Sequence, residues 1–322
     1  MAVGNTTTTE VSAAVNNFYD RKLLKAARPL LLHTNWAQVR DLPKNSSMVI
    51  KFRRYSLLAA NTTALTEGVT PSGKQLAVTD VSSTVAQYGD FVTLTDKLQF
   101  STLDPVLTET AELLGQQAGN SLDQICRDVM TAGTTVQYAS SATSTATVTS
   151  SMKITLAEIQ EAVKTLQTND AMKITKMVNP STGFNTSPIM PAFVGIISPK
   201  THYDLKNVTG WVPVAQYSVQ SNLLPGEVGT LDEVRFCLTT NADFSDDGGS
   251  GSIDVAFTMI LAQDYYAISR ISGHALENVV KPLGSAGTAD PLDQRSTSGW
   301  KATFVATRLN ENFAVRIEHA TS

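Results

Sequence analysis

The sequence predicts an α+β fold, in which strands and helices follow one another without a repeating βαβ unit. Three observations support this prediction. Residues 48–55 and about 79–96 alternate between apolar and polar side chains, as half-buried strands do. A long amphipathic helix is expected over residues 104–131. Short apolar strands then alternate with shorter helices, and no internal repeat is present.

The composition is that of a globular protein with a weakly charged surface. The chain has 322 residues, of which 42% are hydrophobic and 17% charged, enough for one large or two ordinary domains. No window approaches the ~18 uninterrupted apolar residues of a membrane span, so no membrane is expected. Cys126 and Cys237 lie far apart in apolar surroundings, which predicts buried thiols and no disulfide.

Charge is distributed unevenly along the chain. Residues 1–54 contain nine Lys and Arg but only three acidic residues, a net charge of +6. Because the whole chain has a net charge of −4, the remaining 268 residues have −10. The basic segment suits a polyanion or an acidic protein surface, and a solvated basic face is the alternative.

The N-terminal segment is predicted to be an arm followed by a hairpin. A helix is expected over residues 11–27, and Pro29 and Pro43 prevent regular structure in the segment after it. The strands at 48–55 and 79–96 form one long hairpin, whose intervening loop of some twenty residues turns at Pro71 and Gly73. Gly89 in the return strand indicates a bulge or a close backbone approach.

The next element is the long helix. Asp104 is the expected N-cap, Pro105 occupies the first helical position, and Gly133 lies just past the end. An apolar stripe steps along it by three or four residues: Leu107, Ala111, Leu114, Ala118, Leu122, Ile125 and Val129.

The second half combines short helices and strands. Residues 129–152 carry no charge and are expected to form a surface connection or an edge strand. A capping box of Thr155 and Glu158 begins a helix, and Pro199 begins another. Strands are expected in AFVGIISP, EVRFCLTT and IDVAFTMILA. The C-terminal residues 299–320 are predicted to form a hairpin of two strands around residues 310–312.

No arrangement of residues indicates catalysis. The four histidines have no metal-binding spacing, and neither a nucleophile elbow nor a complete phosphate loop is present, so no enzyme activity and no cofactor are expected. One candidate calcium loop exists, with Asp243, Ser245, Asp247 and Asp254 at EF-hand-like spacing. The residues on either side of this loop have the pattern of strands and not of helices. An exposed acidic loop between strands is therefore the favoured interpretation, with calcium binding as the other.

The basic strand KFRRY does not form one wide patch, because alternation places Lys51 and Arg53 on one face and Arg54 on the other. No nucleic-acid-binding module is present. Subunit salt bridges are therefore the preferred interpretation of these three residues over nucleic-acid contacts.

The order of these elements resembles the major capsid proteins of tailed phages, the Hong Kong 97 fold. The segments IKFRRYSLLAANTTALTEGVTPSGKQL, VAQYGDFVTLTDKLQFSTLDPVLTETAELLGQQAG and GWKATFVATRLNENFAVRIE are similar to coat proteins of the coliphage N-four type. The resemblance covers residues 48–138 and the C-terminal end, whereas residues 139–298 resemble the family only in the order of strands and helices.

The resemblance implies a division into parts. These are an N-terminal arm (1–47), an E-loop hairpin (48–100), a spine helix with the first part of the peripheral domain (101–149), an axial domain (150–260) and the second part of the peripheral domain (261–322). The E-loop would lie across a neighbouring subunit. The expected interface residues are Lys51, Arg53, Arg54, Leu65, Glu67, Val69, Pro71 and Lys74.

The implied function is a shell of hexamers and pentamers that encloses double-stranded DNA without sequence specificity, assembled in the host cytoplasm as the virion capsid. Implied partners are other copies of the chain and a portal, with scaffold or decoration proteins as further candidates. Some members of the fold cross-link an E-loop lysine to an asparagine of another subunit. Lys74 with Asn310 or Asn312 is the candidate here. A nanocompartment shell and a β-rich virion accessory or surface-binding protein remain alternative functions.

Overall fold

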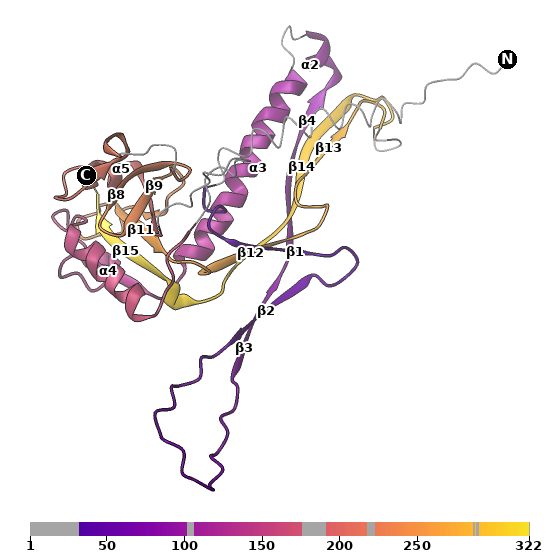
Figure 1. Ribbon diagram of the computed structural model, residues 1–322. Coiled ribbons are helices and arrows are strands. Elements are labelled where there is room, and N and C mark those ends of the chain that lie inside the picture. The colour runs from indigo at the N-terminus through magenta and orange to yellow at the C-terminus, as the bar shows by residue number, and fades with distance from the viewer. Residues whose placement is uncertain are drawn as a thin grey trace.

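The computed structural model describes residues 32–101, 106–175, 191–217, 223–285, 287 and 290–321. The helix predicted for residues 11–27 and the predicted cap at Asp104 and Pro105 lie outside this range. Figure 1 shows the described elements as two bodies of sheet and helix, from which a long hairpin loop projects.

The first sheet has five strands, in the order β1-β12-β14-β13, with β4 also paired to β14. Strand β14 pairs with β12 near its C-terminal end and with β4 and β13 toward its N-terminal end. The strands are β1 (Gln38–Leu42), β4 (Ala86–Thr95), β12 (Tyr266–Ile271), β13 (Glu277–Lys281) and β14 (Arg295–Arg308).

The second sheet has eight strands, in the order β5-β15-β11-β6-β9-β8-β7, with β10 also paired to β11. Its central strand β6 is buried along its whole length, as the apolar run AFVGIISP predicted. The strands are β5 (Val136–Tyr138), β6 (Phe193–Ile197), β7 (Val212–Pro213), β8 (Glu227–Leu231), β9 (Val234–Leu238), β10 (Phe244–Ser245), β11 (Val255–Leu261) and β15 (Ala314–Ala320).

The predicted hairpin is present, but its return strand is divided. Strand β2 (Val49–Tyr55) pairs with β3 (Val78–Thr84), and the chain then enters the first sheet as β4. The break falls at Val85, which is 2% exposed and whose N–H donates to the carbonyl of Met48 at 2.8 Å. The expectation of one continuous strand over 79–96 is therefore wrong, because the two halves pair with different partners.

The long helix is α3 (Val106–Thr131), preceded by the short α2 (Asp96–Ser101). Its predicted stripe is confirmed from Ala111 to Leu122, because Ala111, Leu114, Ala118 and Leu122 are buried, and Ile125 and Val129 are partly buried against the same cluster. The helix runs beside β4 and β14 (Figure 1). Gly89 of β4 approaches the backbone of β14 closely, since a Cβ there would lie 2.6 Å from the carbonyl oxygen of Trp300.

The smaller helices also begin where the sequence predicted. Helix α4 (Leu156–Thr168) begins after Thr155, whose backbone N–H donates to the Glu158 carboxylate at 2.8 Å in a capping box. Helix α5 (Pro199–Leu205) has Pro199 in its first turn and Ser198 as its N-cap. Short 3-10 turns occur at η2 (Thr145–Thr147), η3 (Val214–Gln216) and η5 (Glu311–Phe313).

The predicted C-terminal hairpin is wrong. Strands β14 and β15 are consecutive, but β14 pairs with β12, β13 and β4, whereas β15 pairs with β11 and β5. The turn η5 therefore passes the chain from the first sheet to the second. The pairing of each strand is therefore set by distant strands of its own sheet and not by the local turn at residues 310–312.

Two large clusters of buried side chains stabilise the molecule, beside a small third one of Val148, Val255 and Ala320. One lies between α3 and both sheets, with Leu114 of α3, Ile196 of β6 and Phe304 of β14 among its members. The other lies between α4 and the second sheet and includes Ile159, Phe236 and Ile317. Cys126 and Cys237 are buried free thiols, which confirms their prediction. No described helix is long and apolar enough to cross a membrane.

Candidate functional site

The loop between β2 and β3, residues 56–77, projects away from both sheets (Figure 1). Every residue in it is exposed, including several large apolar side chains. Leu57 is 92% exposed, Leu65 is 73% exposed and Val69 is 62% exposed. Burying an apolar side chain of this size stabilises a protein by about 1.5–3 kcal/mol, so the loop leaves this free energy unused in the single subunit.

A few hydrogen bonds shape this loop from within. The Ser56 N–H donates to the Ala77 carbonyl at 2.9 Å, which closes the end of the strand pair. Lys74 donates from Nζ to the Ala59 carbonyl at 2.7 Å, which joins the two limbs. At the tip, Gly68 has a positive φ of 79° that a residue with a side chain rarely adopts.

The predicted interface residues fall into two groups. Lys51, Arg53 and Arg54 are exposed on β2, where Arg53 Nε lies 3.1 Å from Asp80 of β3 and this hydrogen bond raises the pKa of Arg53. All three line a cavity of about 590 Å³ at the base of the hairpin. The second group, Leu65, Glu67, Val69, Pro71 and Lys74, is exposed in the projecting loop. The role of both groups at an interface stays a prediction.

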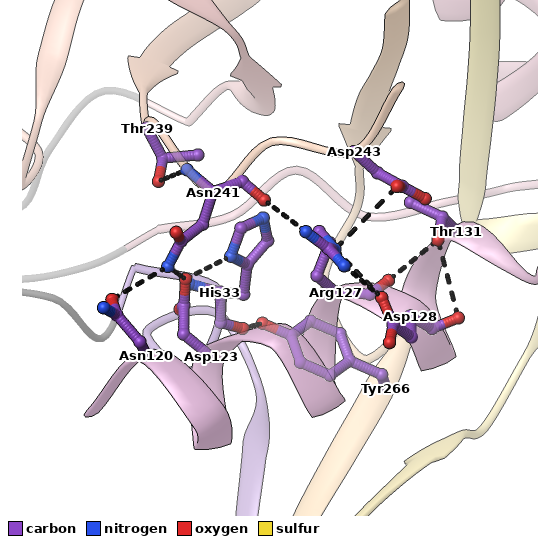
Figure 2. Close-up of polar contacts among 10 residues, drawn as sticks. All are labelled: His33, Asn120, Asp123, Arg127, Asp128, Thr131, Thr239, Asn241, Asp243 and Tyr266. Carbon is purple, nitrogen blue, oxygen red and sulfur yellow. Dashed lines mark hydrogen bonds and ion pairs between the residues drawn. The ribbon is translucent and has the colours of Figure 1, made fainter. Parts of the chain in front are cut away.

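A buried polar junction joins four segments that are distant in the sequence. Asp123 of α3 is fully buried and accepts from the His33 backbone N–H at 2.7 Å and from its ring Nδ1 at 2.8 Å. The side-chain amide of Asn241, between β9 and β10, donates to the same carboxylate at 2.9 Å (Figure 2). The hydroxyl of Tyr266 in β12 donates to the His33 carbonyl.

A second set of contacts extends the junction toward the surface. Arg127, one turn after Asp123 on α3, donates to the Asn241 carbonyl at 3.4 Å and lies 3.9 Å from Asp243 (Figure 2). Sequence reasoning missed this junction. The available signal was the helical spacing of Asp123 from Cys126 and Met130, which are both fully buried, because a charged residue on a buried line of a helix needs polar partners.

The candidate calcium residues are only partly brought together. Carboxylate oxygens of Asp246, Asp247 and Asp254 lie within 4.8 Å of one another, whereas Asp243 faces Arg127. Lys200 Nζ lies 2.5 Å from Asp254 and lowers the pKa of that carboxyl, while Asp254 raises the pKa of Asp246. The neighbouring elements β10 and β11 are strands, as the alternative interpretation expected. Calcium binding by Asp243, Ser245, Asp247 and Asp254 stays a prediction.

The candidate cross-linking residues occupy separate places. Lys74 lies in the projecting loop. Asn310 precedes the turn η5, where its side-chain oxygen accepts from the Asn312 N–H at 3.4 Å. Glu311, between the two asparagines, pairs with Arg308 at 2.5 Å. A bond from Lys74 to either asparagine therefore concerns two different subunits, and it stays a prediction.

Three comparisons with known proteins bear on this geometry. Residues 77–317 match the family model described as phage capsid protein. No curated protein matches the chain in sequence. Solved structures match its fold over most of both chains, and those described below are phage capsids.

The capsid of Ralstonia phage GP4 is 12% identical, has a TM-score of 0.68, and the match covers 88% of this chain and 87% of that one. The cyanophage Pam1 capsid is 15% identical, with a TM-score of 0.63 and 92% of each chain covered. The capsid of cyanophage P-SCSP1u is 13% identical, with a TM-score of 0.61 and 89% and 87% covered. At these identities the structures show the fold, which confirms the predicted α+β capsid fold.

The family match decides between the functions that the sequence left open. It extends over well over half of the chain and describes a phage protein with a structural role, not a nanocompartment shell or an enzyme. The chain therefore belongs to the phage capsid protein family, as a major capsid protein of the Hong Kong 97 fold in the bacteriophage head.

Proposed function

We propose that the loop of residues 56–77 is the arm by which each subunit holds a neighbouring copy within hexamers and pentamers. The observation that supports this most strongly is the exposure of Leu57, Leu65 and Val69 in a loop whose every residue is exposed. A monomeric protein seldom exposes so many large apolar side chains in one segment, and such segments mark interaction sites.

The basic strand β2 has a complementary role in this proposal. Lys51, Arg53 and Arg54 lie where the hairpin leaves the body, and the cavity there also contains Asp41 and Asp264. Cations at the rim of an interface orient partners more than they add affinity. We therefore assign these three residues to subunit contacts that set the direction of the arm.

The division into parts is proposed as the sequence suggested it, with one change. Residues 1–47 form the N-terminal arm, 48–100 the E-loop hairpin, 101–149 the spine helix and the first peripheral part, and 150–260 the axial domain. The second peripheral part, expected over residues 261–322, ends before β15 (Ala314–Ala320) in this proposal. Strand β15 pairs with β11 and is therefore assigned to the axial domain.

The closer relationship and the remaining partners are also proposals. The segments from residue 48 to 138 support a place among the coat proteins of the coliphage N-four type. The net charge of −10 outside residues 1–54 suits a container in which packaged double-stranded DNA is enclosed without specific binding. A portal is the expected further partner, with scaffold or decoration proteins as candidates.

Deletion of residues 60–76 tests the proposed arm. We expect the shortened subunit to fold, because the removed residues are exposed and contribute nothing to either buried cluster. It should remain unassembled under conditions in which the full chain forms particles. Electron microscopy and sedimentation velocity would measure assembly, and circular dichroism would confirm the fold.

Replacing residues 60–76 with a Gly/Ser segment of the same length is the matched control for loop length. This control should also fail to assemble, because it removes the apolar side chains but keeps the connection. Normal particles from either variant would refute the arm.

A further inference from the structure

A trough lies on the side of the first sheet that faces away from α3, which is called the outer side. It is a second exposed surface of the molecule, besides the projecting loop. It has a volume of about 770 Å³ and lies over β13, β14 and β4. The opposite side of these strands faces α3, as shown by Trp300 Nε1, which donates to Gln117 of that helix at 3.2 Å. On the trough side, Phe91, Val279 and Lys281 are exposed.

The strand register defines the floor of this outer trough. Gly299 of β14 lies between Val279 of β13 and Phe91 of β4, and registered partners point to the same side of a sheet. Phe91 is 67% exposed and Val279 is 42% exposed. A Cβ on Gly299 would lie 2.7 Å from the Cβ of Phe91, so Phe91 lies close over Gly299 and forms an apolar floor together with Val279.

Two lysines for which the described part of the chain offers no ion pair border the floor. Lys281 lies across from Thr297 on one side of the apolar row, and Lys301 lies two residues beyond Gly299 on the other. Neither has an ion pair among the described residues. The acid registered opposite Lys301, Glu277, instead pairs with His274, and Arg295 lies 3.7 Å from Asp290. Asp90 also belongs to the lining, but its carboxylate accepts from Gln117 of α3 at 2.6 Å, so the trough has an apolar centre and a lysine at each end.

The projecting loop has the complementary pattern. Leu65 and Val69 are both exposed, and Glu67 between them is the only acid of residues 56–77. The only cation of the loop, Lys74, already donates to the Ala59 carbonyl. The tip thus presents two exposed apolar side chains and one carboxylate that has no ion pair among the residues the structure describes.

We propose that the outer trough of one subunit holds the segment 65–69 of a second copy of this chain. Leu65 and Val69 cover Val279, Gly299 and Phe91, while Glu67 pairs with Lys281 and Lys301. This inference rests on the proposed arm and adds its receiving surface. The second copy is the favoured occupant because a capsid protein meets its own copies, and because the charges and apolar side chains of the two segments match.

Charge reversal tests the pairing. The variants Glu67→Lys and Lys281→Glu/Lys301→Glu each replace an attraction between opposite charges with a repulsion between like charges. Because the contact is partly shielded from water, each variant should lower the association constant by about tenfold. Particle yield, measured by sedimentation velocity, should fall in both. The triple variant, which carries all three reversals, should restore it. A Lys164→Glu/Lys206→Glu variant has the same change in net charge at exposed positions outside the trough and should assemble normally.

The results distinguish the trough from the arm. If deletion of residues 60–76 stops assembly but Lys281→Glu/Lys301→Glu assembles normally, the arm stands and the trough is refuted. A triple variant that assembles no better than the variants it combines also refutes the pairing.

A cross-linking experiment tests the same contact without altering charge. Cysteines at Val69 and Val279, joined by a short flexible bismaleimide in assembled particles, should give a ladder of covalent multimers on a denaturing gel. The buried Cys126 and Cys237 should add no background. Cysteines at Val69 and Leu113, which is exposed on α3, form the control and should give no ladder. The absence of multimers with Val279, or equal multimers with Leu113, would overturn the proposal.

Discussion

Asp123 is an acidic side chain with no exposed surface, and all of its described partners come from segments outside its own helix. His33 precedes β1, Asn241 lies between β9 and β10, and both donate to its carboxylate. A buried charge is costly unless hydrogen bonds replace its water, and here three donors do so. At the scale of single residues, this junction connects α3 to the second sheet and to the segment that enters the first.

Asp123→Ala should lower the free energy of unfolding of the isolated subunit by about 3 kcal/mol, because it leaves the His33 and Asn241 donors buried without an acceptor. Urea denaturation followed by circular dichroism would measure this. Asp128→Ala removes a carboxylate from the same helix whose side chain is 64% exposed, and it should change stability by less than about 1 kcal/mol. Equal effects of the two substitutions would contradict the assigned role of the junction.

His319 provides a second test at this scale. It is fully buried, its Nδ1 lies 3.0 Å from the Ala320 carbonyl oxygen, and its Nε2 lies 2.9 Å from the Thr258 hydroxyl, so both ring nitrogens have hydrogen-bond partners. Burial lowers the pKa of His319, and burial also lowers that of His202. A lowered folded-state pKa means that the unfolded chain binds the proton first. This contribution to stability is complete above the unfolded-state pKa of about 6.5 and is lost as the pH falls below it.

The urea midpoint should therefore decrease as the pH falls from about 7.5 to about 5.5. His319→Gln keeps polar atoms at this position but does not titrate, so the decrease should be smaller in this variant, whatever its absolute stability. An unchanged dependence on pH would show that His319 does not contribute.

At the scale of elements, local signals were predicted well and pairings were not. The capping box of Thr155 and Glu158 and the Pro199 start of α5 depend on neighbours within a few residues, so the sequence contains them. The break at Val85 depends on the distant strand β14, and the separation of β14 from β15 depends on β11 and β12. A short polar turn at residues 310–312 is equally compatible with a hairpin and with a change of sheet.

The same limit applies to the candidate site. The projecting loop was predictable, because a long Thr- and Gly-rich segment between two strands has little to bury. The junction at Asp123 and the outer trough were not predictable. Each brings together residues that are roughly a hundred or more positions apart in the sequence. The junction joins His33 to Asp123, and the trough joins Phe91 to Gly299.

Gly195→Ala should destabilise the subunit by about 1–3 kcal/mol, as overpacking of a tight core does. Gly195 lies in β6, and an added Cβ would approach the Phe236 ring of β9 to 2.5 Å and Val234 to 3.1 Å. Thermal denaturation would measure the effect. Gly73→Ala in the projecting loop is the control, since nothing lies within 4 Å of its added Cβ. A comparable loss of stability in both variants would contradict the packing argument.

At the scale of the whole molecule, α3 unites the two sheets. The buried cluster around it includes Ile196 and Met259 of the second sheet together with Trp300 and Phe304 of the first. Neither sheet can lose its packing on α3 without exposing side chains of the other. We therefore propose that the axial and peripheral parts differ in their position in the shell and do not fold independently.

This sharing predicts a single unfolding transition for the subunit. Trp300 reports on the cluster around α3, and Trp211 packs against the cluster around α4. Each variant keeps only one of these two tryptophans, and the other tryptophans are changed to Phe. In each variant, the urea midpoint from the remaining tryptophan's fluorescence should equal the midpoint from circular dichroism. Two separate midpoints would show that the sheets unfold independently.

Strand β14 has one further consequence for the shell. Ten consecutive residues of it, from Arg295 to Phe304, are in register with β4, which continues through Val85 into the projecting arm. A neighbour that pulls on the arm along the strand axis would therefore load this ladder in shear, with its hydrogen bonds sharing the force at once instead of opening in sequence. An antiparallel ladder resists shear far better than peeling, so this geometry equips the subunit to bear tension.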